Sequence, residues 1–229
     1  TGKDPNDAKS VALDIGYNSA GLQPILKGKR FGAIKQLLER DSIYKASIEK
    51  LKLAGAEVVE VTPPQVGMNG FLSILNIDMK NDLPAYLKAN ANAGVKITDM
   101  ESVIAFNNAD STKRIPYGQA LFNGIVADTT SAESLEKIIA NLEKNGRHFF
   151  DAVLDKHKID AVLSINNYHA GYAAVAKYPA LTVPMGYKTN GEPISLTFIG
   201  KQFQERKLLE LGAGFEAISK VRKAPKGFD

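Results

Sequence analysis

Residues 178–200 read YPALTVPMGYKTNGEPISLTFIG, in which a short polar bend separates two apolar runs. The first run covers residues 180–187 and is rich in branched side chains, and the second covers residues 194–200. Asn190 and Gly191 between them indicate a tight reversal, because both residue types tolerate positive φ. This stretch therefore predicts a β-hairpin near the end of the printed sequence.

A parallel strand pair is predicted near the other end of the chain. Residues 29–34 (KRFGAI) and residues 57–61 (EVVEV) have the composition of short strands. Between them, Asp41 is a good N-cap for an amphipathic helix, and Gly55 supplies its stop. A β–α–β crossover of this kind makes its two strands parallel neighbours.

The segments around the hairpin indicate a mixed sheet. Residues 160–164 (DAVLS) have the pattern of a buried strand, followed by a loop and a short alanine-rich helix over residues 171–176. Residues 203–222 are amphipathic and are expected to form a helix that covers the hairpin. We therefore predict an α/β fold, a mixed β-sheet covered by helices, in a single domain over residues 1–229.

The middle of the chain is predicted to be helical. Residues 78–88 carry apolar side chains on one helical face, and Thr98 followed by Glu101 has the pattern of a capping box. Residues 131–157 form the longest periodic segment. Gly146 interrupts that segment, so a bend or a second helix start is expected there.

Composition excludes several classes of protein. The chain has 229 residues, of which 44% are hydrophobic and 24% charged, as in an ordinary globular protein with a full core. Its formal net charge of +4 is spread along the sequence, whereas nucleic-acid binding usually needs a concentrated basic face. Cysteine is absent, which excludes disulfides and cysteine-ligated zinc, and the three histidines lack an HExxH spacing.

The distribution of apolar and charged residues also predicts the cellular location of the protein. No apolar run approaches the ~18 residues of a membrane span, and no charged-then-apolar leader is present. We expect a cytoplasmic chain without metal or cofactor, which contacts neither nucleic acid nor membrane; a removed leader is the alternative. The chain begins at Thr1, which is explained either by trimming or by an absent upstream part.

One loop is the best candidate for a binding surface. In open α/β sheets, the loops that follow the carboxyl ends of strands line the ligand crevice. The segment SINNYHAG follows such a strand and carries Asn166, Asn167, Tyr168 and His169, which offer donors, acceptors and an aromatic face. The alternatives are that the asparagines form a turn and that His169 caps the following helix.

The order of these segments resembles the C-terminal end of the amidase signature family. Residues 178–225 have that family's Pro-Ala-x-x-Val-Pro strand, a second strand ending in Ile-Gly, a covering helix and a basic tail with a proline. Residues 78–90, 97–110 and 115–126 resemble the branch that includes peptide amidases, and residues 1–10 resemble the linker after the family's catalytic half. The resemblance covers nearly all of the chain.

This resemblance implies the C-terminal portion of the amidase signature fold, with residues 1–27 as the linker from a missing catalytic half. Family members hydrolyse linear carboxamides with a Ser-Ser-Lys triad and a loop rich in glycine and serine. This chain contains no Gly-Ser or Ser-Gly dipeptide, so the triad is expected upstream and no residue here is catalytic. The alternative is a non-catalytic binding or regulatory module that retains the scaffold.

The resemblance also implies a partner and two further site residues. Tyr117 and Gln119 are candidates for substrate contact because the similar family segment borders the cavity, although they are equally consistent with a helix start. Two departures alter the predicted binding loop: Lys177 replaces a frequent glycine, and Gly171–Tyr172 replaces a Ser-Pro step. The implied partner is a small-molecule or peptide amide, bound by the parent protein. An exposed sheet edge or apolar face would favour a homodimer.

Overall fold

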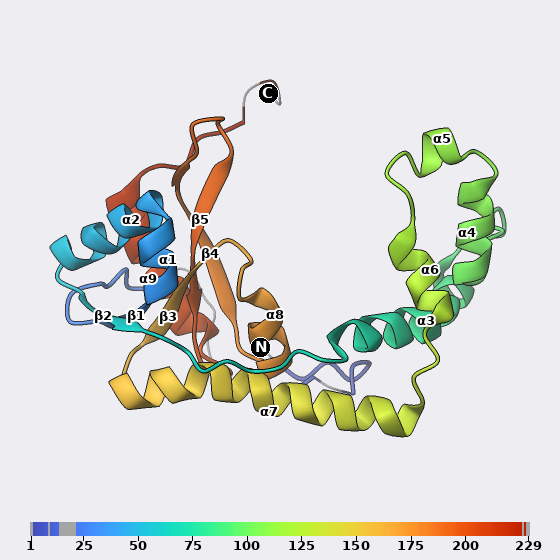
Figure 1. Cartoon of the computed structure of the whole chain (residues 1–229), viewed down its shortest axis with the longest axis horizontal. Coiled ribbons are helices and arrows are strands. Elements are labelled where there is room, and N and C mark those ends of the chain that lie inside the picture. Colours follow the sequence, from blue (N-terminus) through green and yellow to red (C-terminus); the bar gives the residue numbers. More distant parts are fainter. Residues whose placement is uncertain (1, 9, 14–21, 226, 228–229) are drawn as a thin grey trace. The chain divides into compact units, whose positions relative to one another are not determined.

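A computed structural model of the chain describes residues 2–8, 10–13, 22–225 and 227, which fall into two compact units. The first unit comprises Thr1–Val66 and Lys144–Asp229, and the second comprises Gly67–Glu143. Figure 1 labels the helices and strands of both units. The interpretation of residues 1–229 as a single domain stays a prediction, and the predicted linker over residues 1–27 lies partly outside the described residues.

The first unit is built on a mixed β-sheet, as the sequence predicts. Its strand order is β2-β1-β3-β5-β4, with β1 parallel to β2 and β3, and β5 antiparallel to β3 and β4. The strands are β1 (Arg30–Ile34), β2 (Glu57–Val61), β3 (Ala161–Ile165), β4 (Ala180–Tyr187) and β5 (Pro193–Ile199).

The predicted hairpin is formed by β4 and β5. Both strands begin and end within one residue of the predicted bounds. Gly191 lies in the reversal with φ of 85°, a conformation that glycine adopts without strain. The main-chain N–H of Lys188 donates to the carbonyl of Glu192 at 2.8 Å and closes the turn. The hairpin thus adds two antiparallel strands beside β3.

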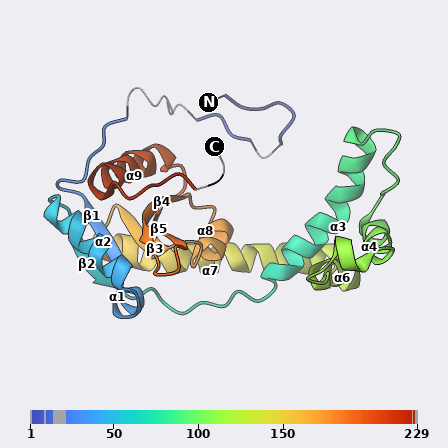
Figure 2. The same cartoon turned by 90° about the horizontal axis from the view of Figure 1, so that it is seen from above.

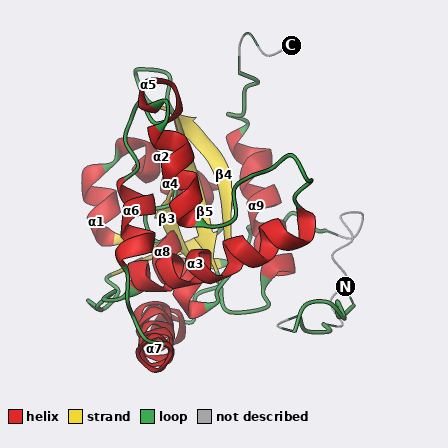
Figure 3. Ribbon diagram, turned by 90° about the vertical axis from the view of Figure 1, so that its right-hand side faces the viewer, coloured by secondary structure: helices red, strands yellow, loops and turns green. Residues whose placement is uncertain are grey.

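Helices cover both faces of this sheet. They are α1 (Lys35–Arg40), α2 (Ser42–Leu53), α8 (Ala170–Ala176), α9 (Glu205–Ser219) and the second half of α7 (Ala132–His157). Figure 2 shows α9 on one side of the strands and α7 on the other, and Figure 3 shows α9 beside β4. Asp41 caps α2 as predicted, because its carboxylate accepts the N–H of Tyr44 at 2.8 Å.

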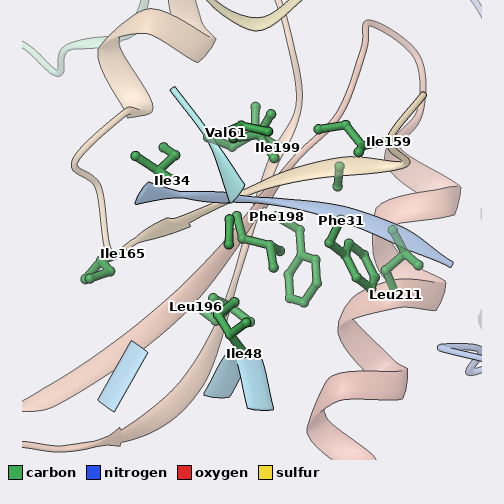
Figure 4. Packing of buried hydrophobic residues seen from close by; sticks show 14 of the residues in the cluster. Phe31, Ile34, Ile48, Val61, Ile159, Ile165, Leu196, Phe198, Ile199 and Leu211 are labelled. Atoms are coloured by element: carbon green, nitrogen blue, oxygen red, sulfur yellow. The ribbon is translucent and has the colours of Figure 1, made fainter. Parts of the chain in front are cut away.

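An aromatic cluster joins the two ends of the chain in the core. The ring of Phe31 on β1 meets the ring of Phe198 on β5 edge-on, with centroids 5.8 Å apart. Phe198 also lies 6.0 Å from Phe215 of α9. Figure 4 shows Phe31 and Phe198 next to Leu211 of α9. All four side chains are fully buried, so the hairpin is fixed to the parallel strands by packing as well as by hydrogen bonds.

The second unit is helical, as the sequence predicts. Its helices are α3 (Phe71–Asn90), α4 (Met100–Asn108), α5 (Ser111–Arg114), α6 (Ala120–Ala127) and the first half of α7. Lys80 on α3 donates to the carbonyls of Val126 and Asp128 at 2.9 and 3.0 Å, which ties α3 to the end of α6. Within the described ranges, no helix has both the length and the apolar character needed to span a membrane.

The capping box lies one residue later than the sequence predicts. Asp99, not Thr98, is the N-cap of α4, and its carboxylate accepts the N–H of Ser102 at 2.8 Å. The Ser102 hydroxyl in turn accepts the N–H of Asp99 at 3.0 Å. The predicted pairing of Thr98 with Glu101 was wrong, because the short side chains of Asp99 and Ser102 already satisfy each other's main-chain N–H groups.

Gly146 does not break α7, which is continuous from Ala132 to His157. The predicted second helix start was therefore wrong, and the glycine serves packing. A Cβ at Gly146 would lie 2.7 Å from the main-chain oxygen of Tyr172 and 2.9 Å from the main-chain nitrogen of Ala176. The missing side chain lets α7 lie directly against the backbone of α8.

Gly146→Ala is expected to lower the free energy of unfolding by about 1–3 kcal/mol, because the new methyl group meets backbone that cannot move aside. Helix propensity alone predicts the opposite sign, a gain of about 1 kcal/mol. The matched control is Gly124→Ala in α6, where an added Cβ meets no atom within 4 Å. Urea titrations should show the control to be neutral or stabilised. Stabilisation by Gly146→Ala would contradict the close packing of α7 on α8.

Candidate functional site

A cavity of about 680 Å³ lies at the carboxyl ends of the three parallel strands. Ile34 ends β1 and Val61 ends β2, and both line the cavity together with residues 62–66. A third side is formed by His169, in the turn that follows β3. The carboxyl edge of parallel strands is where open α/β sheets place their ligands, and this volume is typical of small-molecule sites.

The cavity combines a polar rim with an aromatic wall. Lys35, Gln36 and Glu39 of α1 are exposed and contribute one charge of each sign to the rim. The wall consists of Phe149, His169 and Tyr172. The rings of Phe149 and Tyr172 are stacked with centroids 4.5 Å apart, and His169 stacks on Phe149 at 5.5 Å. A flat, uncharged group matches such a wall in shape and polarity.

Ser164 fixes the histidine ring of this wall. Its hydroxyl lies 2.6 Å from Nδ1 of His169, and Ser164 itself is 0% exposed within β3. A nucleophile must be reachable by its substrate, so this Ser–His pair cannot act as a hydrolytic dyad. Ser164 instead orients the imidazole, and Nε2 is the ring nitrogen left for a ligand.

His169 is held in its uncharged form. Burial lowers the pKa of His169 below its ordinary value of 6.5, because the low-dielectric surroundings disfavour the imidazolium. At neutral pH the side chain therefore offers the cavity one neutral ring nitrogen rather than a positive charge.

The lowered pKa predicts a pH dependence of stability. Below about pH 6.5 the unfolded chain binds a proton that the folded chain resists, so stability falls as the pH drops through the unfolded value. We expect the wild type to lose more stability between pH 7.5 and pH 5 than His169→Gln does, measured by urea denaturation at each pH. His148→Gln, at an exposed position, is the control and should keep the wild-type profile. Parallel profiles for wild type and His169→Gln would contradict the assignment.

Tyr44 determines where the parallel strands separate. The β1–β3 register ends at Ala33↔Leu163. At that point the buried hydroxyl of Tyr44 accepts the N–H of Ile34 at 3.2 Å and donates to the carbonyl of Leu163 at 2.8 Å. Burial raises the pKa of Tyr44, so the hydroxyl keeps its proton. A side chain from α2 thus replaces a direct strand-to-strand bond at the edge where the cavity lies.

The asparagines of the predicted binding loop have structural contacts. Asn166 adopts φ of 45°, and its side-chain oxygen accepts the N–H of Ser195 at 2.8 Å while its carbonyl accepts the hydroxyl of Thr197 at 2.6 Å. The carbonyl of Asn167 accepts the N–H of Ala170 at 3.0 Å. These bonds extend the β3–β5 pairing into the turn, as the alternative interpretation of the asparagines expected.

The remaining loop residue and the two distant candidates differ in their surroundings. Tyr168 is exposed, and Asn166 and Asn167 line a second hollow of about 360 Å³ on the sheet face beside α8. Tyr117 and Gln119 lie in the second unit, where Tyr117 is fully exposed and Gln119 is the N-cap of α6. Ligand contact stays a prediction for all six of these candidate residues, His169 included.

Phe149 and Tyr172 of the aromatic wall, and the supporting Ser164, were not among the site residues predicted from sequence. Phe149 and Tyr172 belong to a helical stripe and an alanine-rich helix, where a core role is the ordinary expectation. The contact between Ser164 and His169 could have been inferred from their spacing. Ser164 lies on β3, and His169 lies five positions later, directly before α8. Within the described residues, no three His, Asp or Glu side chains are grouped as metal ligands would be.

Comparison with known proteins relates this geometry to a family. No protein-family model matches the chain. The chain is 28% identical to the "Probable amidase" of Arabidopsis thaliana, over 98% of this chain and 46% of that protein. It is 27% identical to one component of the glutamyl-tRNA(Gln) amidotransferase of Ruminiclostridium cellulolyticum, over 94% of this chain and 50% of that protein.

Solved structures agree with the sequence matches. An amidase family protein from Bacillus anthracis superposes with a TM-score of 0.78 and 33% identity, over 88% of this chain and 40% of that chain. This chain matches the C-terminal portion of the amidase signature family. Native peptide amidase from Stenotrophomonas maltophilia, another amidase signature enzyme, superposes with a TM-score of 0.76 and 26% identity, over 89% of this chain and 45% of that chain.

The matches confirm the amidase signature resemblance and the α/β fold class that the sequence predicted. The chain spans about half the length of the curated relatives it matches.

Proposed function

We propose that this chain is the C-terminal half of an amidase that hydrolyses a linear carboxamide, with the Ser-Ser-Lys triad carried outside residues 1–229. The observation that supports this most is the peptide amidase comparison, which extends over 89% of this chain but over 45% of that chain. In this proposal the substrate of the whole protein is a small-molecule or peptide amide.

The role of this half is to shape the substrate site. Attack on a carboxamide needs an activated serine and donors aimed at the developing oxyanion. The described residues do not supply an activated serine through the Ser164–His169 pair, because Ser164 is fully buried and its hydroxyl contacts Nδ1 of His169. They supply the cavity at the carboxyl ends of β1, β2 and β3 instead, where a substrate side group can be bound while the reaction occurs elsewhere.

The proposal is tested by comparing two forms of the protein. The 229-residue chain and the longer native chain that contains it are each incubated with C-terminal peptide amides, and ammonia release is measured. We expect turnover by the longer chain and a rate at the buffer background for the 229-residue chain. Turnover by the 229-residue chain would overturn the proposal, because it would place the catalytic groups within it.

A binding or regulatory module is the second candidate function. The observation that favours it is that every residue lining the cavity belongs to the first unit of this chain. This candidate requires the native protein to lack amidase activity and still to bind an amide. Ammonia release by the native protein would exclude it.

We also propose that the protein is cytoplasmic. A separate proposal is that the 229-residue chain self-associates. The apolar side chains Leu72, Leu75, Met79 and Tyr86 on α3 are about half exposed or more, and the first three follow a helical spacing. Exposed apolar surface of this kind favours association. Light scattering should give at least a dimer, and a strictly monomeric species at high concentration would contradict this.

A further inference from the structure

The hydrogen bond to Ser164 assigns the tautomer of His169 and therefore the donor that His169 presents to the cavity. Ser164 is fully buried, so its hydroxyl proton needs a protein acceptor, and Nδ1 of His169 lies 2.6 Å away. We therefore assign the Ser164 hydroxyl as the donor and Nδ1 as the acceptor. A neutral imidazole whose Nδ1 accepts carries its proton on Nε2. His169 then presents one N–H donor and no charge to the cavity that it lines.

The cavity walls limit which ligand groups can reach the N–H donor of His169. Phe149 and Tyr172 form the stacked pair beside His169, and Pro63 and Pro64 of the loop after β2 also line the cavity. Aromatic and proline surfaces favour a flat apolar group over an aliphatic chain. The two charged lining residues, Lys35 and Glu39, have opposite signs and both stand at the exposed rim. The cavity therefore gives no net charge to pair with an ionic ligand.

We propose that this cavity binds an uncharged aromatic carboxamide, with its ring against the Phe149–Tyr172–His169 wall and its carbonyl oxygen accepting the Nε2–H of His169. The choice of a carboxamide among carbonyl compounds rests on the proposed function. The geometry itself requires a flat group with one acceptor. His169 is a binding residue in this proposal, and Ser164 is the residue that positions it.

Nuclear magnetic resonance tests the proposal directly, because the chain has three histidines. In the protein labelled with ¹⁵N-histidine, His169 is identified by the signals missing from His169→Gln. At pH 7.5 we expect His169 to show the neutral Nε2–H tautomer. Addition of benzamide should shift the Nε2–H resonance of His169 and leave His148 unmoved. A neutral Nδ1–H tautomer, or an unshifted His169 at saturating benzamide, would overturn the proposal.

The benzamide affinity of each variant, measured by the same titration, shows how much each side chain contributes to binding. We expect His169→Gln to weaken benzamide binding about three- to tenfold and Tyr172→Ala about tenfold, as for loss of one hydrogen bond or one stacked ring. Ser164→Ala should retain binding but give a mixture of His169 tautomers. The exposed His148→Gln is the matched control and should bind like the wild type. Benzoate should bind more weakly than benzamide, and equal affinity of wild type and His169→Gln would overturn the assigned contact.

These readouts distinguish failure of this inference from failure of the proposed function. Binding of benzamide at His169 without amide hydrolysis by the longer native chain would leave the inference standing and exclude the amidase. Hydrolysis by the longer chain without any effect of benzamide on His169 would leave the amidase standing and overturn the inference.

Discussion

Phe198→Ala is expected to lower the free energy of unfolding by about 3–5 kcal/mol. Phe198 is fully buried on β5 and contacts two aromatic rings, Phe31 of β1 and Phe215 of α9. Truncation would leave a cavity between the parallel strands and the covering helix. Because both layers lose contacts at once, the surrounding structure has little room to relax around the missing ring.

Guanidinium titration followed by circular dichroism measures this loss. The matched control is Phe106→Ala on α4, whose ring is 52% exposed and has the guanidinium of Arg114 3.7 Å from its centroid. That change should cost about 1 kcal/mol or less, the value of an exposed cation–π contact. If Phe198→Ala cost no more than the control, the hairpin could not be packed between β1 and α9 as described.

Tyr44→Phe is expected to cost about 2 kcal/mol or more, although it removes a single oxygen atom. The hydroxyl satisfies the buried N–H of Ile34 and the buried carbonyl of Leu163, and each orphaned group costs about 1–3 kcal/mol. The loss of this bridge should also change the cavity beside Ile34, because β1 and β3 separate at that point.

Denaturant titration gives the loss of stability, and benzamide affinity reports the change in the cavity. Tyr86→Phe on α3 is the matched control, because Tyr86 is 64% exposed and surface changes of this kind stay within about 0.5 kcal/mol. Unchanged stability in Tyr44→Phe would show that the two strands bond to each other without help from α2.

The strands and their turns could be predicted from sequence because their signals are local. Asn190 and Gly191 marked the reversal, and Asp41 and Gly55 marked the ends of α2. Short helices were missed, since α1 and α5 have six and four residues and carry too little periodicity. Gly146 was misinterpreted because its reason for being glycine is the backbone of α8, which no pattern within α7 reveals.

The candidate site could be predicted only in part. The loop after β3 was found because strand ends on one edge line the ligand crevice, and it contributes His169. Lys35, Glu39 and Phe149 come from other segments, and their meeting depends on the strand order β2-β1-β3. Sequence spacing does not encode that order, so the rest of the cavity became visible only in the folded chain.

The size of the protein in its native source decides whether this chain is one half of an amidase. An antibody raised against this chain would be used to detect the protein in a native extract, and its intact mass would be measured. Because the chain spans about half of its curated relatives, the proposed function leads us to expect a species about twice the 24.8 kDa of this chain, with amidase activity. A single species of 24.8 kDa would contradict the proposal that this chain is half of an amidase, and the binding module would become the function to pursue.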